Sequence, residues 1–465
     1  ENPTLTKINE SIHRNEGYQK SIMEEQKTKK SRYQKSEELL ERALKTIPLG
    51  TQTFSKSKTQ YPFGVSPYFI EKASGAYVWD ADGNKYIDFI NSLCSITLGY
   101  NDKDVMKAVQ NQIKIGTIFS LPHRLEIEVS EKICEMVPCA EKVRFGKNGS
   151  DVTSGAIRVA RAYTGRDHVL VCGYHGWHDW YIGTTDRNKG IPAETQAMTY
   201  TFQYNDVSSV LDAIDDDTAA IILEPMVFEV PKDNFLHRLR DICTERGILL
   251  IFDEMWTGFR LSVGGAQEYF GVKSDLACFS KAVANGMPLS ILTGRKDVMK
   301  LLEHDVFFYT TFGGEALSLA AALATIHVLR EKNVPAFLAS QGDKLLHGYN
   351  EICEDFGITF TRCVGLGCRS MVQFDATGLV TALEMKTYMQ QELLRYGILW
   401  TGFHNMCYSH TDKDIKNTLA AYRKILPQLK KHIDLGTLLD HLHGDTLKPV
   451  FRKTSNFNTK PKQTV

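Results

Sequence analysis

Short apolar runs alternate with helix-like segments through the middle of the chain. Seven of them have the composition of buried strands, and they lie at 142–145, 169–172, 198–202, 219–223, 248–252, 276–279 and 290–292. Strands that alternate with helices predict a layered α/β fold with a mostly parallel sheet. The clearest unit spans 219–253, because apolar residues repeat at helical spacing from Phe235 to Cys243 and Gly247 follows. We expect strand, helix and parallel strand there.

Smaller elements flank this central region. Residues 77–89 predict a hairpin of two short strands around an Asp-Gly turn, and 36–44 predicts a helix. An alanine-rich helix at 316–329 is followed by a strand at 370–374 and two further helices that end near 433. This change of pattern predicts a second, smaller α+β domain.

The two ends of the chain are polar. The composition of 1–36 favours a solvated arm or frayed helix without function, and that of 448–465 favours a disordered tail. The expected division is a polar arm at 1–36, an N-terminal segment at 37–95 that contributes to the small domain, a large domain at 96–329, a C-terminal small domain at 330–435 and a tail at 436–465.

Composition and charge narrow the possible partners. The chain has 465 residues, and its 55 basic and 55 acidic side chains cancel, which argues against nucleic acid and anionic membranes. No window approaches about eighteen uninterrupted apolar residues and no signal peptide is recognisable, so we expect a cytoplasmic protein without a membrane span. The ten cysteines form no CxxC pair, which favours reduced core thiols over disulfides or a zinc site.

Chemically useful residues follow three of the predicted strands. Asp253-Glu254 follows 248–252, Ser280-Lys281 follows 276–279, and Glu224-Pro225 follows 219–223. Because ligands of open α/β sheets bind beyond the carboxyl ends of the strands, two acids and a lysine are expected to converge there.

Other ligand sites are less well supported. An apolar run that ends in Asp-Glu also resembles the acidic strand of nucleotide hydrolases, but no GxxxxGK[ST] phosphate loop occurs, and no GxGxxG dinucleotide motif follows a strand. His175 and His178 are three residues apart without a further ligand at a familiar spacing, so they are interpreted as pocket lining and no metal site is expected.

A phosphate site is indicated between the strand that ends near Phe145 and the next helix. The loop contains Lys147, Gly149, Ser150 and Asp151 and opens a helix with an apolar face. The N–H groups and dipole of a helix N-terminus favour an anion, although Ser150 or Asp151 could equally be a plain N-cap.

These parts fit pyridoxal phosphate. A lysine can form a Schiff base with its aldehyde, and a carboxylate can hold its pyridine nitrogen protonated, so that the ring withdraws electrons from the substrate. Lys281 and Asp253 are the candidates for these roles. The alternative for Asp253 is a structural ion pair with Arg260.

Over about 45–430 the sequence resembles class III pyridoxal-phosphate aminotransferases, most closely the glutamate-1-semialdehyde aminomutase-like branch. The resemblance rests on Ile47-Pro-Leu-Gly50, Asn148-Gly-Ser-Asp151, Tyr174-His-Gly176, Ile222-Leu-Glu-Pro225, Phe252-Asp-Glu-Met-Trp-Thr-Gly-Phe-Arg260, Ser280-Lys281, Thr311-Phe-Gly-Gly314 and Ser409-His-Thr411. It implies the aspartate-aminotransferase fold (fold type I), in which a large domain with a seven-stranded, mostly parallel sheet binds the cofactor.

The resemblance also implies roles for single residues. Lys281 would be the Schiff-base lysine and proton shuttle, Asp253 the partner of the pyridine nitrogen, and Tyr174 the ring stacked on the cofactor. Gly149, Ser150 and Asp151 would surround its phosphate, and His175 and Glu224 would line the cofactor site. Thr311 would reach the phosphate held by a neighbouring subunit, which implies a homodimer with shared active sites.

Departures from the aminomutase pattern concern the substrate. Phe228-Glu229-Val230 replaces a stretch that carries an Asn, and the position of a C-terminal Glu falls near Gly402, beside Phe403 and His404. Lys56 stands where an Arg contacts the substrate carboxylate, and a lysine is a point cation rather than a two-pronged donor. Lys56, Glu229 and His404 are therefore the candidate substrate residues.

The resulting hypothesis is an ordinary transaminase that moves an amino group from a small-molecule amino donor to a keto or aldehyde acceptor by a ping-pong mechanism through Lys281. The stretch 281–290 is similar to that of family members in sugar, capsule or antibiotic pathways, which suggests a carbohydrate-like acceptor. Two alternatives stay open, an intramolecular aminomutase of the glutamate-1-semialdehyde type and a non-catalytic protein that binds pyridoxal phosphate.

Overall fold

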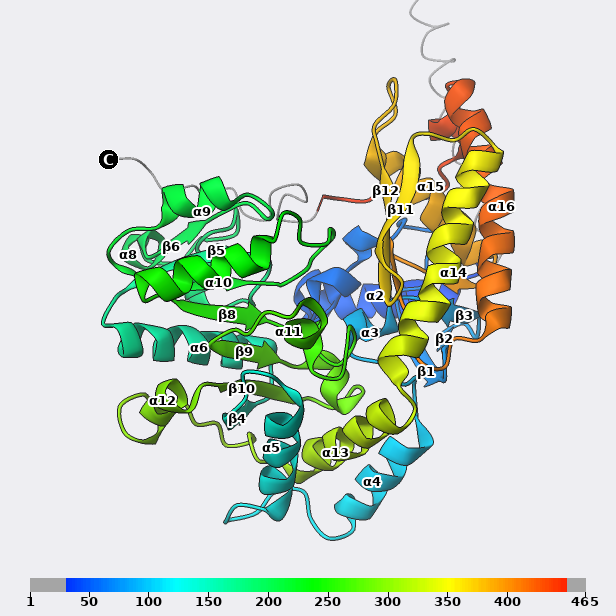
Figure 1. Ribbon diagram of the computed structural model, residues 1–465. Coiled ribbons are helices and arrows are strands. Elements are labelled where there is room, and N and C mark those ends of the chain that lie inside the picture. The colour runs from blue at the N-terminus through cyan, green and yellow to red at the C-terminus, as the bar shows by residue number, and fades with distance from the viewer. Residues whose placement is uncertain (1–30, 450–465) are drawn as a thin grey trace, which may run out of the picture.

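The computed structural model describes residues 31–449, and the two predicted polar ends lie mostly outside them. A seven-stranded sheet forms the centre of the larger part of the molecule (Figure 1). Its strands, in spatial order, are β4 (Lys142–Gly146), β10 (Ser290–Gly294), β9 (Leu276–Phe279), β8 (Leu249–Asp253), β7 (Thr218–Leu223), β5 (His168–Cys172) and β6 (Thr199–Thr201). The apolar runs thus predicted all seven strands.

Six strands of this sheet share one direction, and β10 runs against both of its neighbours, β4 and β9. The carboxyl ends of β4, β5, β7, β8 and β9 therefore meet at one edge. The predicted unit at 219–253 is confirmed, since α10 (Phe235–Arg246) connects the parallel strands β7 and β8. Gly247 ends α10 with a left-handed φ of 63°, a conformation that glycine adopts without strain.

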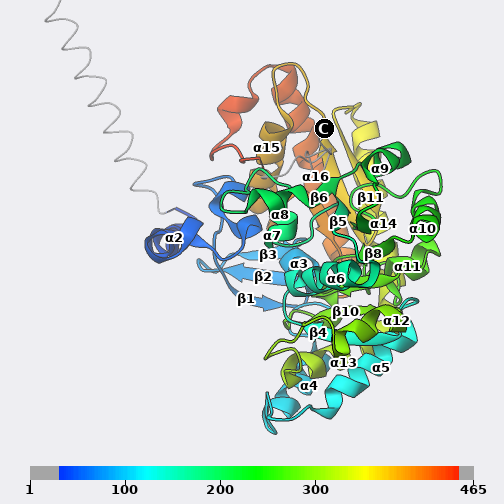
Figure 2. The ribbon, with the colours of Figure 1, turned by 90° about the vertical axis from the view of Figure 1, so that its left-hand side faces the viewer.

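Helices cover both faces of the sheet. The apolar side of α6 (Gly149–Thr164) packs on one face, and α9 (Val207–Ala213) and α10 pack on the other. In Figure 2, α9 and α10 lie on the side opposite to the N-terminal strands. The other helices before residue 330 are α2 (Gln34–Thr46), α3 (Asn91–Cys94), α4 (Lys103–Ile113), α5 (Arg124–Met136), α7 (Asp179–Ile182), α8 (Ala193–Ala197), α11 (Gly265–Phe270), α12 (Lys296–Met299) and α13 (Ala316–Glu331).

The smaller part of the molecule combines both ends of the chain. The predicted hairpin is present as β2 (Tyr77–Asp80) and β3 (Lys85–Asp88), with β1 (Ile70–Ser74) beside β2 and the distant β13 (Ile398–Leu399) parallel to β3. A second sheet contains β11 (Thr361–Leu366), β12 (Arg369–Phe374) and β14 (Phe403–Asn405). The helices are α14 (Val334–Asp355), α15 (Ala382–Arg395) and α16 (Asp412–Asp434), of which α14 and α16 lie side by side (Figure 1). The combination of these sheets and helices agrees with the expected small α+β domain, whose boundaries stay a prediction.

Two features of this part were not predicted. The sequence interpretation passed over α14, which packs its buried side against β11 and α16. Residues 436–449 were assigned to the tail, yet Leu438 and Leu447 are buried and Asp445 forms a β-bridge with Phe63. The described part of that segment is therefore packed on the folded body.

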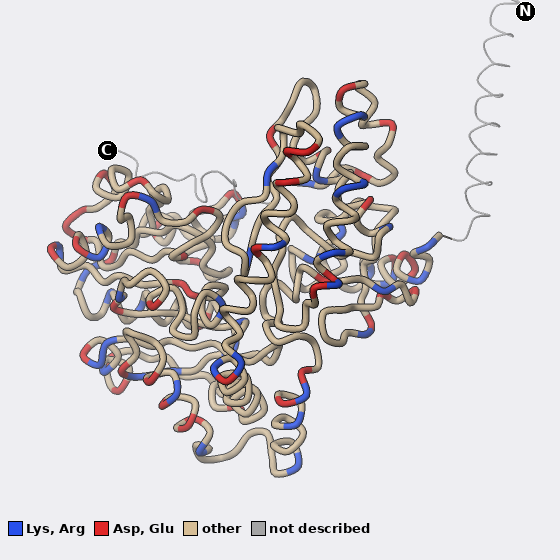
Figure 3. Tube along the Cα trace, turned by 45° about the vertical axis from the view of Figure 1, so that its right-hand side comes forward, with Lys and Arg blue, Asp and Glu red and all other residues tan. Residues whose placement is uncertain are grey.

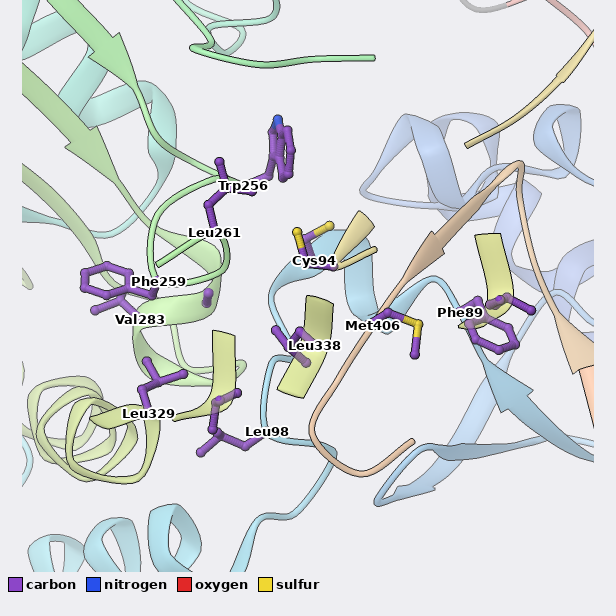
Figure 4. Packing of buried hydrophobic residues seen from close by; sticks show 14 of the residues in the cluster. Phe89, Cys94, Leu98, Trp256, Phe259, Leu261, Val283, Leu329, Leu338 and Met406 are labelled. Carbon is purple, nitrogen blue, oxygen red and sulfur yellow. The ribbon is translucent and has the colours of Figure 1, made fainter. Parts of the chain in front are cut away.

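One hydrophobic core joins the two parts. Figure 4 shows Phe259 and Val283 from the large sheet region in the same cluster as Leu338 of α14, Phe89 and Met406. All ten cysteines are free and nine are buried, as expected for reduced core thiols. Basic and acidic residues are interspersed along the described trace (Figure 3).

Candidate active site

The residues selected from strand ends gather at one edge of the central sheet. Asp253 is the last residue of β8, Lys281 follows β9 by two residues, and Glu224 follows β7 directly. Tyr174 and His175 follow β5, and the loop before α6 follows β4. The sheet order β4-β10-β9-β8-β7-β5 therefore places five chemically distinct segments along the same edge.

Asp253 and His175 form a fully buried pair. Asp253 Oδ2 lies 2.7 Å from His175 Nδ1, and both side chains are inaccessible to solvent. The other ring nitrogen, Nε2, lies 3.2 Å from the carbonyl oxygen of Cys172. Both ring nitrogens of His175 therefore face oxygen atoms, and the ring fixes the orientation of the Asp253 carboxylate.

The alternative interpretation of Asp253, a structural ion pair with Arg260, is wrong. Arg260 is buried and donates to the carbonyl oxygens of Met406 (2.6 Å) and Cys94 (3.1 Å) and to the hydroxyl of Thr97 (3.0 Å). The second oxygen of Asp253 instead accepts the N–H of Met255. These two contacts fix the Asp253 carboxylate at the strand end.

Arg260 also supports a strained turn beside the site. The four residues Asn91–Cys94 have φ values of 47°, 48°, 57° and 72°, a left-handed run that costs energy in residues with a Cβ. The bond from Arg260 to the Cys94 carbonyl holds the end of this turn. Cys94 is near enough to Lys281 for its charge state to act on that lysine.

Lys281 lies where β9 passes into a short 3-10 helix, and its own φ is 46°. Ser280 anchors the start of this turn, because its hydroxyl donates to the Leu289 carbonyl at 2.6 Å. Burial lowers the pKa of the Lys281 amine, and the charge of Arg369 lowers it further, whereas Cys94, Glu224 and Asp253 raise it. The site therefore favours a neutral, nucleophilic amine more than water does.

The loop before α6 has the shape expected of an anion site. Ser150 lies in the first turn of this 16-residue helix, where backbone N–H groups have no partner within the helix. A Cβ on Gly176 would lie 2.3 Å from Ser150 Oγ, so only glycine allows the loop after β5 to approach this turn. A phosphate bound there would meet free helix N–H groups, a hydroxyl and the positive end of the dipole.

Asp151 has a different position from the one expected of a phosphate contact. Its Oδ2 accepts the N–H groups of Lys147 (3.0 Å) and Asn148 (2.8 Å), which turns the carboxylate back onto its own loop. Gly149 packs against Met255, where a Cβ would lie 3.0 Å from the sulfur atom. The Asp151 carboxylate therefore shapes the loop through these two backbone bonds.

Tyr174 and Glu224 connect neighbouring strand ends. Glu224 Oε2 accepts the N–H of Tyr174 at 2.9 Å. The Tyr174 ring is 38% exposed and meets the Tyr181 ring edge-on, with 5.6 Å between centroids. An exposed aromatic face at this edge suits a planar ligand.

The three candidate substrate residues do not gather at this edge. His404 is fully buried between Ser370 and Tyr422, at 2.9 and 2.7 Å from their hydroxyl groups. Glu229 is exposed and paired with Lys232 at 2.6 Å. Lys56 lines a cavity of about 500 Å³ together with Asp88, and its charge lowers the pKa of Asp88 against the larger, opposite effect of burial. The burial of His404 in particular leaves no surface for a substrate.

Thr311 lies in an exposed loop before α13. The neighbouring Phe312 is 57% exposed, and Phe307 is 73% exposed. A site contact by Thr311 would therefore have to be made across an interface.

Arg369 is a residue of this region that the sequence interpretation missed. Its guanidinium carbon lies 4.5 Å from the Trp256 ring centroid and 4.3 Å from that of Phe403. Trp256 comes three residues after Asp253. Nothing in the local sequence distinguishes Arg369. The pairing of β12 with β14 brings distant residues such as Phe403 close to it.

The donor set fits pyridoxal phosphate. A buried carboxylate, an amine of lowered pKa and a helix N-terminus with a hydroxyl match its pyridine nitrogen, aldehyde and phosphate, and they share one sheet edge. The fold and site define a fold type I pyridoxal-phosphate transaminase. The chain belongs to the class-III aminotransferase family, whose profile matches residues 60–418.

Curated relatives include both aminotransferases and aminomutases. The chain is 36% identical over 411 residues to 3-aminobutyryl-CoA aminotransferase of Cloacimonas acidaminovorans (strain Evry), covering 85% of this chain and 98% of that protein. It is 35% identical to glutamate-1-semialdehyde 2,1-aminomutase of Syntrophobacter fumaroxidans (strain DSM 10017 / MPOB), covering 84% and 97%. These similarities establish the class of reaction and leave the substrate open.

Solved structures agree with the fold. The FumI protein of Sphingopyxis sp. MTA144, in a form that contains pyridoxal phosphate, superposes with a TM-score of 0.79 at 29% identity, covering 86% of this chain and 97% of that one. An omega-transaminase from Sphaerobacter thermophilus superposes with a TM-score of 0.76 at 25% identity, covering 85% and 98%. The fold type I architecture and the cofactor are thereby confirmed.

Residues 31–449 contain neither a helix that could span a membrane nor a cluster of side chains that could hold a metal ion. No helix in this range is both long and apolar enough to cross a membrane. Within the same range, no group of three or more His, Cys, Asp or Glu side chains is arranged to hold a metal ion.

Proposed function

We propose that this chain is an intermolecular aminotransferase that works in two half-reactions, first taking an amino group from a donor and then giving it to a keto or aldehyde acceptor. The observation that carries the proposal is the placement of Lys281 beside the buried Asp253–His175 pair at one sheet edge. For the acceptor we propose a carbohydrate-like carbonyl compound, on the similarity of 281–290 to family members in sugar and antibiotic pathways.

The residues divide the work of holding the cofactor. Ser150 and the N–H groups at the start of α6 would bind its phosphate, Tyr174 would cover its ring, and Asp253 would keep a proton on the pyridine nitrogen. Bound pyridoxal phosphate supplies a ring that withdraws electrons from the substrate carbon bonded to nitrogen. His175 holds the Asp253 carboxylate in place, since its Nδ1 lies 2.7 Å from Oδ2.

Lys281 would move the proton in both half-reactions. Its Nζ takes the proton from the substrate carbon that carries the amino group, which requires a neutral amine. Burial, together with the charge of Arg369, lowers the Lys281 pKa and so increases the neutral fraction. The charge of Glu224 raises the Lys281 pKa. Glu224 also positions Tyr174, because its carboxylate accepts the backbone N–H of Tyr174.

We further propose a cytoplasmic homodimer in which Thr311 completes the site of the partner subunit. Large apolar side chains are exposed in two neighbouring segments, including Ile115 (66%), Leu121 (79%) and Phe312 (57%). The N–H of Ala316 donates to the carbonyl of Thr117, which holds the two segments together. Exposed apolar surface of this kind is typical of a protein interface.

A single-turnover experiment separates the proposal from its alternatives. The purified enzyme is loaded with pyridoxal phosphate and mixed with single amino donors, without any acceptor. An intermolecular transaminase releases one equivalent of oxo product per site and keeps the amino group. An aminomutase returns only isomerised substrate, and a non-catalytic binding protein releases nothing.

A further inference from the structure

The loop expected to bind the phosphate and the segment that carries Lys281 meet at one strand pair. Gly146, the last residue of β4, pairs with Ser290, the first residue of β10. The anion loop, residues 147–151, leaves the sheet directly after Gly146, and the lysine segment, residues 280–289, enters it directly before Ser290. A Cβ on Gly146 would lie 2.7 Å from Ser290 Oγ, so the two segments start in close contact. The strand pairing ends here, and other contacts must hold the two segments beyond it.

The side chain of Lys147 bridges the anion loop and the lysine segment. Its Nζ donates to the carbonyl oxygen of Pro288 at 3.1 Å. The next carbonyl oxygen, of Leu289, accepts the hydroxyl of Ser280 at 2.6 Å. Two consecutive carbonyl groups of the lysine segment thus connect the anion loop to the residue directly before Lys281.

The anion loop is held together by its own hydrogen bonds, so Lys147 positions all of it. Asp151 Oδ2 accepts the backbone N–H groups of Lys147 and Asn148. The residues from Gly149 onward already belong to the first turn of α6. The bond from Lys147 to the lysine segment therefore fixes the loop together with the N-terminus of this helix.

The carboxylate of Glu315 holds the ammonium group of Lys147. Glu315 Oε2 lies 2.9 Å from Lys147 Nζ, and the two side chains are largely buried, at 16% and 15% exposure. Glu315 is also the N-cap of α13, where it accepts the N–H groups of Leu317 and Ser318, and α13 packs in the main core. Burial alone would raise the pKa of Glu315, but hydrogen bonds from the Ser318 hydroxyl and from Lys147 bring it below its usual value, so the carboxylate is charged. The ammonium group is thus fixed between a helix end and a backbone carbonyl.

Pyridoxal phosphate is a short, stiff molecule that must reach two separate groups of the protein. Its phosphate is expected beside Ser150 at the start of α6, and its aldehyde at Lys281. A ligand that is bound at both ends gains from the second contact only when the two sites are held at the right separation. A side chain that fixes this separation contributes to affinity without touching the cofactor.

We propose that Lys147 is a positioning residue, which, held by Glu315, keeps the anion loop at the distance from Lys281 that lets the cofactor bind at both ends. This inference rests on the proposed roles of Ser150 and Lys281. It gives Lys147 a function toward the cofactor that acts through the backbone of the two segments.

The test removes the ion pair without changing the net charge beside the anion loop. In the double variant Lys147→Met/Glu315→Gln, one positive and one negative charge are lost. The affinity of the full-length apoenzyme for pyridoxal phosphate, measured by fluorescence titration, should fall by about 10- to 100-fold, because its two sites are no longer held at a fixed separation. The affinities for inorganic phosphate and for pyridoxal, each of which occupies one end, should change less than about threefold, a bound set well below that expected loss.

Lys142→Met/Glu303→Gln is the matched control. Lys142 is the first residue of β4, and its Nζ lies 2.6 Å from Glu303 Oε1 in a pair that is more exposed, at 39% and 40%. This double variant should leave all three affinities unchanged. Lys147→Arg keeps a positive charge and hydrogen-bond donors opposite Glu315, so it should recover most of the affinity for pyridoxal phosphate.

The ratio of the affinities separates positioning from other roles. A double variant that binds inorganic phosphate as the wild type does has an intact anion site, so a selective loss of affinity for pyridoxal phosphate is not due to unfolding. Equal losses for pyridoxal phosphate and inorganic phosphate would show that Lys147 acts on the phosphate itself and would overturn the proposal. Unchanged affinity for pyridoxal phosphate would overturn it as well. The titrations contain no amino donor, so a failure of the transaminase proposal leaves their result valid.

Discussion

The imidazole of His175 and the carboxylate of Asp253 lie 2.7 Å apart in the solvent-free interior, although the two residues are 78 positions apart in the chain. Their contact joins the loop after β5 to the end of β8, across the intervening strand β7. The imidazole therefore lies behind the carboxylate that is expected to face the cofactor nitrogen and fixes its orientation.

Removing the imidazole should weaken cofactor binding. His175→Phe leaves the buried Asp253 carboxylate without its partner at Oδ2, so that it is no longer held in the position expected for contact with the pyridine nitrogen. We expect the affinity of the apoenzyme for pyridoxal phosphate, measured by fluorescence titration, to fall by about 10- to 100-fold. His178→Gln alters the other histidine of the motif, which contacts Ser154, and should leave the affinity nearly unchanged. Equal affinities in wild type and His175→Phe would refute this role of His175.

Glu254 has a structural role beside Asp253. Its Oε2 accepts the Ala266 N–H (2.6 Å) and the Thr257 hydroxyl (2.9 Å), and its Oε1 accepts the Gln267 N–H (3.2 Å). Glu254→Gln places an amide NH₂ against one of these donors and should lower the free energy of unfolding by about 1–3 kcal/mol. Urea denaturation of the apoenzyme measures this change. Glu245→Gln, at an exposed position, is the control. Equal denaturation midpoints for the two variants would contradict the structural role of Glu254.

Two buried histidines should make the protein sensitive to acid. Burial lowers the pKa of His404 to about 3 and that of His410 to about 4. Since both values lie below the unfolded value of about 6.5, the stability is fully present above about pH 6.5 and is lost as the pH falls. His404 alone should lower the free energy of unfolding by about 2 kcal/mol at about pH 5, relative to its value above about pH 6.5. Thermal unfolding of apo His404→Phe against pH should show a flatter acid limb than the wild type, and parallel limbs would argue against this assignment.

The exposed apolar segments should carry the dimer. Leu121→Asp places a charge on a side chain that is 79% exposed in the single chain and that we expect to be buried between subunits. Sedimentation should show a shift from dimer to monomer, with loss of turnover because Thr311 no longer reaches a partner site. Leu379→Asp, at an even more exposed leucine of the small domain, should sediment as the wild type. A wild-type monomer with full activity would contradict the shared site.

The sequence was sufficient to predict what depends on local pattern. The seven strands follow from apolar runs, and the approach of Asp253, Lys281 and Glu224 follows from the rule that parallel strands end at one edge. The reversed direction of β10 was not predicted, because 290–292 is apolar in either direction.

Residues whose environment depends on distant partners were assigned less well. His404 was selected for its position in the sequence, yet it lies in the core because β12 and α16 contribute Ser370 and Tyr422. Arg369 was overlooked for the converse reason, since Trp256 and Phe403 reach it from far along the chain. Such contacts have no signature in a local pattern.

The most direct test of the account is the visible absorption of the purified holoenzyme and of Lys281→Ala, before and after single amino donors are added. The wild type should show the visible band of cofactor joined to a lysine, and one donor should convert that band to the form that carries the amino group. Lys281→Ala should lack the initial band. A band that is unchanged in Lys281→Ala, or no band with excess cofactor in the wild type, would contradict the assignment of Lys281.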